Sequence, residues 1–395
     1  MKNSKVKLEK RKFNKKKILI IIFSIFTGIL LFVGLGIGIY YWTTDSAGTV
    51  NIELGEYSDE YEMKYNLTGS RQDATNTKKQ VTKMTNSQLT LYNRLFDSVN
   101  LYDDLINVAY INNHINENIK VNDALYNAFK TINDNKSREI FFGPIFEYND
   151  KIYSLDNDDE VKKIDYNYNS EMYNYLTSIY KFKNDSNAIN IELLDDFVIR
   201  LNVHEAYINL LNENNSKRYI DFGYLKNAFI VDSVANHLSE RGFREGYLMS
   251  SDGYLRVFNN KISRDYDIYD YDKADINIAN ITVVGKSVVN INKFRNKRYI
   301  YSDGRVINNY INPKALGSDL TANTIVCYSS LSCSEMLLKM EGLMYTAISN
   351  YSSLSTNGIN TIYLDGKNIK YNDSSLVFNM ILVNDKYEYK KVALW

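Results

Sequence analysis

Residues 219–232 read YIDFGYLKNAFIVD, and the interpretation of the whole chain starts from this stretch. Its first four residues alternate like a strand, Gly223 is a turn residue, and Lys226 begins a helical register. Apolar residues then recur at helical spacing as far as Gly242, a glycine typical of a helix C-terminus. A strand, a glycine turn and a helix start together place backbone N–H groups and a lysine where an anion can bind.

The same pattern has a simpler interpretation. Strand–glycine–helix units are common in domains that mix helices and strands, and Lys226 also fits an ordinary solvated first-turn residue. Asp232 lies two turns into the expected helix, beside the apolar stripe. A carboxylate in that position needs a partner, because burying an unpaired charge is costly.

Length and composition limit the class of protein. A chain of 395 residues with 45% hydrophobic residues and 34 tyrosines is long enough for one large domain or two ordinary ones. The formal net charge of zero argues against a nucleic-acid partner, which needs a basic surface.

The N-terminal region predicts a membrane anchor. Residues 1–17 contain nine Lys or Arg and one Glu, and residues 18–42 form an uncharged apolar run long enough to span a bilayer. A cleaved signal peptide would have a shorter apolar core, and DSAGT at 45–49 is a poor cleavage site. We therefore expect a cytoplasmic tail (1–17), a transmembrane helix (18–42), a polar stalk (43–85) and an extracellular domain (86–395).

Helices and antiparallel strand pairs alternate along the domain. Helical patterns cover 89–108, 121–132, 171–182 and 334–348. Strand patterns cover 188–193, 197–202, 219–222, 246–249, 254–258, 276–284, 287–291, 298–301, 305–311, 324–327, 361–364 and 369–371. The mixture predicts an α+β fold with a mixed sheet and packed helices.

Cysteine and histidine usage gives little indication of a metal site. Cys327 and Cys333 could form one disulfide in an oxidising compartment, or they could be two small buried thiols. The three histidines are far apart and near no cysteine pair, so we interpret them as ordinary helix or loop residues.

From about residue 89 to 372 the chain resembles the ApbE-type FAD:protein FMN transferases. These are bacterial, usually membrane-anchored enzymes outside the cytoplasm, which cut FAD and attach FMN to a Thr or Ser of a partner protein. Five segments carry the resemblance in the family's order: LFDSVNLYDDLI (95–106), FFGPI (141–145), IDFGYLKNAFIVD (220–232), RVINNYINPKA (305–315) and the strand and helix of 324–343. The third is similar to the family's "v-D-l-G-G-i-A-K-G-y-a-v-D".

The resemblance implies cofactor-binding roles for five residues: Asp221, Gly223, Lys226, Asp232 and, near the glycines of a "G-G-d" turn, Gly253. Two family glycines are replaced: the second glycine of the pair by Tyr224, and the glycine after the lysine by Asn227.

The resemblance also implies catalytic positions at Asn309 and Asn312, where the family has a histidine and an aspartate in "H-I-i-D-P-r-T-G". Asparagine still forms hydrogen bonds, but it cannot take up a proton or carry charge as those residues do.

The implied metal site is altered as well. The family holds Mg²⁺ with an aspartate and a threonine four residues later, and Glu335 and Lys339 occupy those positions here. Lysine cannot ligate Mg²⁺. Glu335 could instead complete a capping box with Ser332, or pair with Lys339, whose charge could also replace that of the lost metal.

These observations lead to three expectations for function. The first is a membrane-anchored FMN transferase-like protein that binds FAD, uses Mg²⁺ if it is active, and modifies an extracytoplasmic flavin-acceptor protein. The second is an inactive flavin- or nucleotide-binding or protein-interaction module, and the third is a surface structural protein. For the first two we expect one cleft to unite Lys226, Asn312 and Glu335.

Overall fold

The computed structural model describes residues 48–270, 276–292, 297–317, 320–345, 355, 357–383 and 388–394. The chain divides into two compact units, one of residues 1–49 and 66–79 and the other of residues 50–65 and 80–395. The predicted cytoplasmic tail and transmembrane helix, 1–42, lie outside the described residues. Within the described part of the chain, no helix is both long and apolar enough to cross a bilayer.

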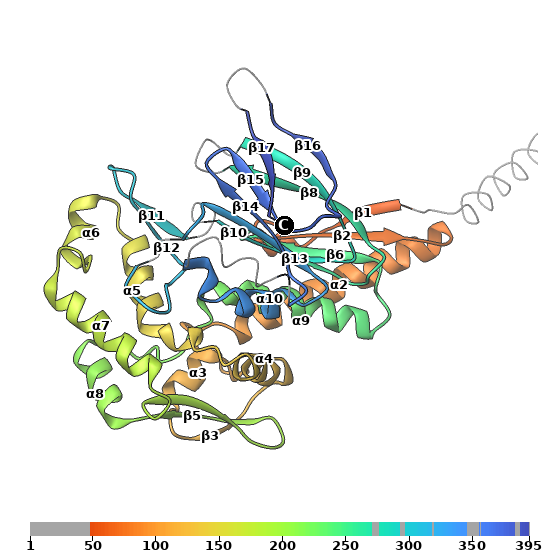
Figure 1. Ribbon diagram of the computed structural model, residues 1–395. Helices are drawn as coiled ribbons and strands as arrows, with labels where there is room; N and C mark the ends of the chain where they lie inside the picture. Colours follow the sequence, from red (N-terminus) through yellow and green to blue (C-terminus); the bar gives the residue numbers. More distant parts are fainter. Residues whose placement is uncertain are drawn as a thin grey trace, which may run out of the picture. The chain divides into compact units, whose positions relative to one another are not determined.

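A nine-stranded mixed sheet organises the larger unit, with strand order β1-β2-β6-β7-β10-β13-β14-β15-β17 (Figure 1). Its neighbours pair antiparallel from β2 to β15, and β15 pairs parallel with β17. The strands are β1 (Gly48–Ile52), β2 (Tyr61–Leu67), β6 (Gly246–Ser250), β7 (Tyr254–Val257), β10 (Ser287–Asn292), β13 (Thr324–Ser329), β14 (Asn360–Asp365), β15 (Asn368–Tyr371) and β17 (Lys390–Ala393).

Three smaller sheets accompany it. β16 (Phe378–Ile381), β9 (Ile276–Val284) and β8 (Ser263–Asp270) form one, β3 (Asn118–Lys120), β5 (Val198–Val203) and β4 (Ile189–Leu193) form another, and β11 (Arg298–Ile300) with β12 (Val306–Asn308) forms a hairpin. Turns at 302–304 and 365–366 join the antiparallel pairs β11–β12 and β14–β15.

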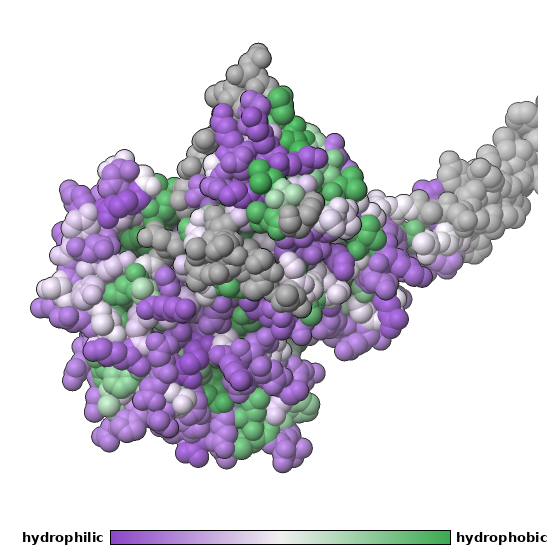
Figure 2. Space-filling model, viewed as in Figure 1, coloured by the Kyte–Doolittle hydropathy of each residue, from purple (hydrophilic) through white to green (hydrophobic). Residues whose placement is uncertain are grey.

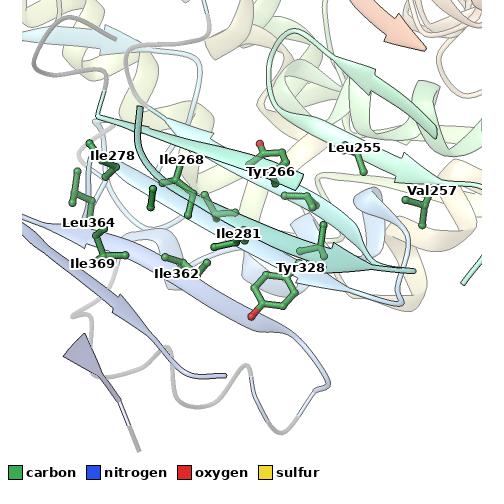
Figure 3. Packing of buried hydrophobic residues seen from close by; sticks show 14 of the residues in the cluster. Leu255, Val257, Tyr266, Ile268, Ile278, Ile281, Tyr328, Ile362, Leu364 and Ile369 are labelled. Carbon is green, nitrogen blue, oxygen red and sulfur yellow. The ribbon is translucent and has the colours of Figure 1, made fainter. Parts of the chain in front are cut away.

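One hydrophobic core cluster lies between the large sheet and the β16-β9-β8 sheet. Side chains from β7, β13, β14 and β15 point toward side chains from β8 and β9, among them Leu255, Ile362, Ile268 and Ile281 (Figure 3). Alternating buried and exposed positions along β8 direct Tyr266 and Ile268 inward. Burial of apolar area on this scale is the main stabilising contribution to the fold.

Helices α9 (Lys226–Glu240) and α10 (Cys333–Met340) contact the large sheet through β6, β7, β10 and β13. The remaining helices are α2 (Arg71–Leu95), α3 (Val108–Asn113), α4 (Asp123–Asp134), α5 (Gly143–Tyr153), α6 (Asp158–Ile164), α7 (Ser170–Asn184) and α8 (Glu205–Glu213). Short 3₁₀ turns lie at Gly55–Tyr57, Glu139–Phe142, Gly223–Leu225 and Leu343–Tyr345. The mixed α+β architecture is therefore confirmed.

On the face of the molecule shown in Figure 2 most of the described surface is hydrophilic. Hydrophobic side chains gather near β9 and β16, where Val284, Val377 and Met380 are exposed.

Two helix ends follow from local sequence signals, and the predicted end at Gly242 is confirmed. Helix α4 begins after Asn122, whose side chain accepts a hydrogen bond from the Ala124 N–H, as a capping residue does. Helix α9 ends at a Schellman motif, in which Gly242 has φ +88° and the Phe243 N–H bonds to the Leu238 carbonyl.

The stalk prediction for 43–85 is wrong for the residues from 48 onward, which form β1, the 3₁₀ turn, β2 and much of α2. Tyr61, Met63 and Tyr65 alternate inward on β2, which pairs with β6. The strand signal was present in that alternation, but it stands among charged and polar neighbours that resemble a linker.

Three element boundaries also differ. Residues 219–222 are not a strand: they form no regular element, and the Asp221 N–H bonds to the Ile140 carbonyl rather than to a sheet neighbour. The helix predicted over 89–108 is two helices, because α2 ends at Leu95 and α3 starts at Val108. The helix predicted from 334 stops at Met340, two residues before Gly342, which has φ +78°.

The disulfide alternative is wrong. Cys327 and Cys333 are both free and buried, and the Cys333 thiol lies 3.2 Å from the Leu255 carbonyl oxygen.

Candidate functional site

Residues from separate parts of the chain line a cavity of about 590 Å³ at the start of α9, which we call the Lys226 cavity. Its walls come from the loop after α2, from α5, from the 3₁₀ turn before α9 and from the turn between β6 and β7. Of the predicted site residues, it brings together Asp221, Gly223, Lys226 and Asn309. Cavities of 300–1,000 Å³ are typical of small-molecule sites.

Asp221 is a buried carboxylate in the wall of this cavity. Its Oδ2 accepts hydrogen bonds from the Ser98 hydroxyl at 2.6 Å and from Arg218 Nη1 at 3.3 Å, and its Oδ1 accepts one from the Gly223 N–H at 2.7 Å. The same Arg218 nitrogen lies 2.6 Å from Asp150 Oδ2. Burial raises the pKa of Asp221 above its usual value, and the neighbouring Arg218 opposes that change.

Gly223 is required by packing. It has φ +49°, and a Cβ there would lie 2.1 Å from the Phe146 ring. The ring therefore occupies the space that a glycine could have opened to a ligand. Tyr224, in place of the family's second glycine, is buried and donates its hydroxyl to Glu139 Oε2 at 3.0 Å.

The positive end of α9 lies at the cavity. Lys226 is the first residue of the helix and half-buried, so its charge adds to the helix dipole where an anion would be stabilised. The next residue, Asn227, accepts a hydrogen bond from the Tyr61 hydroxyl at 2.8 Å and donates one to Asp252 Oδ2 at 3.0 Å. Asn227 thus ties the start of α9 to β2 and to the β6–β7 turn.

The two asparagines of the fourth segment have different surroundings. The half-buried Asn309 lines the Lys226 cavity, and its side chain forms no hydrogen bond with any residue that the structure describes. Asn312 lies outside that cavity: its Oδ1 accepts from the Lys314 N–H, and its own N–H bonds to the Gly317 carbonyl. Asn312 therefore stabilises the loop of residues 312–317.

Asp232 has the partner that its position required. Its two carboxylate oxygens accept hydrogen bonds from the N–H groups of Cys333 at 3.0 Å and Ser334 at 2.8 Å, which begin helix α10. Arg256 Nε lies 3.7 Å from the carboxylate. Burial raises the pKa of Asp232, and Arg256 opposes that change. The residue caps a helix and lies outside the Lys226 cavity.

Gly253 is also structural. It has φ +110°, and a Cβ would meet the Asn290 carbonyl oxygen at 2.5 Å. The Asn290 N–H bonds to the Gly253 carbonyl at 3.0 Å, so β10 packs against this turn.

The capping-box interpretation of Glu335 is confirmed. Ser332 Oγ accepts from the Glu335 N–H, and Glu335 Oε2 accepts from the Ser332 N–H at 3.1 Å. Lys339 is exposed, and among the described residues it forms no ion pair with Glu335, so the pairing alternative is wrong. Glu335 lines a separate cavity of about 380 Å³ with Asp232.

These residues do not fit a Mg²⁺ ion. The Glu335 carboxylate is committed to the helix cap, and Lys339 adds a repelling charge one turn away. Within the described ranges, no three His, Cys, Asp or Glu side chains converge as a metal site requires. The expectation of one cleft uniting Lys226, Asn312 and Glu335 is wrong, because only Lys226 lies in the cavity.

Sequence reasoning missed several residues that line the cavity: Ser98, Asp150, Phe146 and Asp252. The only signal for Ser98 was its place in the first family-like segment, and Asp252 stood in a turn that drew attention only to its glycine. Their proximity to Asp221 and Lys226 results from chain folding over more than 20 residues.

Comparison with solved structures shows that the domain has the fold of the ApbE flavin transferases. No family model matches the sequence, and no curated protein matches it. The structure is similar to the ApbE protein of Thermotoga maritima (TM-score 0.55, 11% identity, covering 80% of this chain and 94% of that one). It is also similar to the flavin transferase ApbE of Vibrio cholerae (TM-score 0.54, 12% identity, 84% and 96%).

Proposed function

We propose that this chain binds FAD in the Lys226 cavity, and that it does so without the metal-assisted transfer of FMN. The observation that carries the proposal is the composition of the cavity wall. Ser98, the Asp221–Lys226 turn and Asn309 come from three separate family-like segments, and they meet in one space of about 590 Å³.

The chemistry of the wall suits a flavin nucleotide in three respects. Lys226 and the positive end of α9 would stabilise a pyrophosphate. The Asn309 amide can donate and accept hydrogen bonds to a heteroaromatic or ribose edge. Phe96, Phe146 and Tyr224 contribute aromatic surface for a planar ring.

The carboxylates in the wall set a limit on affinity. The cavity is lined by Glu60, Asp97, Asp150, Asp221 and Asp252 against two lysines, Lys226 and Lys297. Asp97 accepts hydrogen bonds from the Val99 and Asn100 N–H groups, and Asp150 and Asp221 share Arg218. The remaining negative charge should repel the pyrophosphate, so we expect FAD to bind only modestly better than riboflavin.

Transfer of FMN to a hydroxyl requires a group that takes its proton and a charge that neutralises the leaving phosphate. Asn309 can do neither, Asn312 lies in a loop outside the cavity, and Glu335 caps α10. These positions favour binding over turnover.

Flavin titration of the full-length chain in detergent tests the proposal. We expect Lys226→Ala to weaken FAD binding by at least about five-fold, since it removes one charge contact of roughly 1 kcal/mol. The matched control Lys339→Ala, an exposed lysine outside the cavity, should bind as the unmodified chain does. EDTA should have no effect. A strict Mg²⁺ requirement, or equal loss in both variants, would refute the proposal.

Mass spectrometry separates binding from transfer. We expect an acceptor peptide of the form D-G-A-T-G-A-T to keep its mass after incubation with the chain, FAD and Mg²⁺. A gain equal to FMN would make the chain a transferase, and the binding-only proposal would then be withdrawn.

We also propose that residues 18–42 anchor the protein in a membrane, with residues 1–17 in the cytoplasm and the folded domain outside the cell. The support is the apolar run and the basic cluster before it. External protease added to intact bacteria expressing the chain should digest the folded domain. Protection of that domain in intact cells would contradict the orientation.

A further inference from the structure

A second cavity, of about 550 Å³, lies apart from the Lys226 cavity and shares no lining residue with it. It is bounded by α5, by the loop between α6 and α7, by α7, by the β11–β12 hairpin and by the loop that follows the hairpin. The hairpin contacts α6 through a hydrogen bond that the Tyr299 hydroxyl donates to Asp158 Oδ1 at 2.7 Å. Six tyrosines line it, so we call it the tyrosine cavity: Tyr148, Tyr166, Tyr168, Tyr180, Tyr301 and Tyr310.

Several of the lining tyrosines have their hydroxyl groups engaged by protein atoms, which leaves ring carbons as the part of these side chains open to a ligand. The Tyr180 hydroxyl lies 2.7 Å from the Asn312 carbonyl oxygen, and the Tyr301 hydroxyl donates to Asp165. The Tyr168 hydroxyl accepts from Arg305 at 2.6 Å. Aliphatic side chains such as Ile145 and Leu176 complete the wall. The surface is therefore suited to the flat face of a ring.

One polar side chain in this wall lacks a partner. Asn149 of α5 is only 5% exposed, lines the cavity, and forms no hydrogen bond with any residue that the structure describes. A polar side chain in a cavity wall that has no protein partner is available to hydrogen-bond a ligand. Its adjacent C=O and NH₂ match a molecular edge that carries a donor next to an acceptor.

The charge and polarity of the wall restrict the class of ligand. Arg305, the cation among the described lining residues, is already paired with Asp303 Oδ2 at 2.9 Å and lies 4.3 Å from the Tyr301 ring centroid. A phosphate would thus find no uncommitted positive charge among them. Asn149, Asn167 and Asn308 add neutral polar groups to the aromatic wall, which suits an uncharged ring with a polar edge.

We propose that the tyrosine cavity binds an uncharged planar heteroaromatic ring of the nucleobase or nucleoside class, stacked on tyrosine and held at its edge by the Asn149 amide. Stacking of bases on aromatic side chains and pairing of an asparagine amide with a base edge are established modes of base recognition. The two cavities share no lining residue, although α5 and residues 308–310 contribute to the walls of both, so competition with FAD is one arm of the test below.

Ligand-observed NMR and calorimetric titration of the full-length chain in detergent test this, with uridine as the probe and maltose as the competing class. We expect saturable uridine binding with a Kd below about 1 mM and no maltose binding. Asn149→Leu should weaken uridine binding by about ten-fold or more, since it removes both hydrogen bonds at similar volume. The matched control Asn127→Leu, an exposed asparagine on α4, should leave it unchanged.

Tyr168→Leu provides a second variant that keeps the fold, because Tyr168 is 54% exposed. We expect at least about five-fold weaker binding through loss of stacking. Thermal denaturation checks that each variant is folded, and saturating FAD should not compete with uridine. Maltose binding, absence of uridine binding, competition by FAD, or equal affinity of the Asn149→Leu and Asn127→Leu variants would overturn the proposal.

Discussion

The two ends of the motif 219–232 carry two buried aspartates that have similar surroundings and different roles. Asp221 and Asp232 each accept hydrogen bonds from backbone N–H groups, each lie near an arginine, and each have a pKa raised by burial. Asp221 forms part of the Lys226 cavity, whereas Asp232 is held against the N-terminus of α10.

The difference shows that matching a family pattern does not decide what a residue does. Asp232 occupies a family-like position, yet its carboxylate oxygens accept hydrogen bonds from the Cys333 and Ser334 N–H groups. At Asp221, the turn at Gly223 leaves the carboxylate in a cavity wall together with Lys226. The comparison can be tested by changing each end in turn.

The largest effect is expected from Asp232→Ala. The change leaves the α10 N–H groups and Arg256 without their carboxylate, and breaking a buried pair in this way costs about 3–5 kcal/mol of unfolding free energy. Urea denaturation measures it. Asp221→Ala should cost clearly less, because water in the cavity can replace the carboxylate. Equal destabilisation by the two changes would remove the distinction.

Gly223→Ala should be next in size. The new Cβ would lie 2.1 Å from the Phe146 ring at a positive φ, and overpacking together with left-handed strain costs about 3 kcal/mol. Gly242→Ala is the matched control, since it has φ +88° with nothing within 4 Å and should cost only about 1 kcal/mol. Chemical denaturation of both variants checks this, and a tolerated Gly223→Ala would show that the turn can open to a ligand.

The pH dependence of stability offers a smaller test. The folded-state pKa of Asp232 is raised, so the folded protein binds the proton more tightly than the unfolded chain does. The resulting stabilisation is fully present below the ordinary pKa of about 3.8 and is lost as the pH rises through the raised pKa. Between these two pKa values the unfolding free energy should fall by about 1.4 kcal/mol for each increase of one in pH.

Asp232→Asn should flatten this decline of the unfolding free energy with pH, measured by urea unfolding at a series of pH values upward from about 3.5. An unchanged decline would show that Asp232 does not titrate as inferred.

The smallest effect is expected at the capping box of α10. Ser332→Ala and Glu335→Ala should each lower the unfolding free energy by about 1 kcal/mol, equally with Mg²⁺ and with EDTA. A Mg²⁺-dependent stabilisation that Glu335→Ala abolishes would identify Glu335 as a metal ligand and would contradict its role as a helix cap.

Much of the fold is readable from local sequence, because the signals are short-range. The Asn122 cap, the Schellman glycine Gly242 and the turn at 365–366 involve residues within a few positions of one another. Strand β2 was not predicted, because the alternation of Tyr61, Met63 and Tyr65 indicates a strand clearly only once its pairing with β6 is known. The order of the family-like segments likewise predicted the α+β architecture.

The sequence by itself determined the start of α4, the end of α9, the capping box at Ser332 and the grouping of Asp221, Gly223 and Lys226 in one turn, because these depend on neighbours along the chain. Only the tertiary structure decided that Asn309 reaches the cavity while Asn312 and Glu335 do not. It also decided that Asp232 caps a helix that begins 101 positions later. The physical reason is that the fate of a buried polar group depends on which distant backbone or side chain satisfies it, and chain spacing does not contain that information.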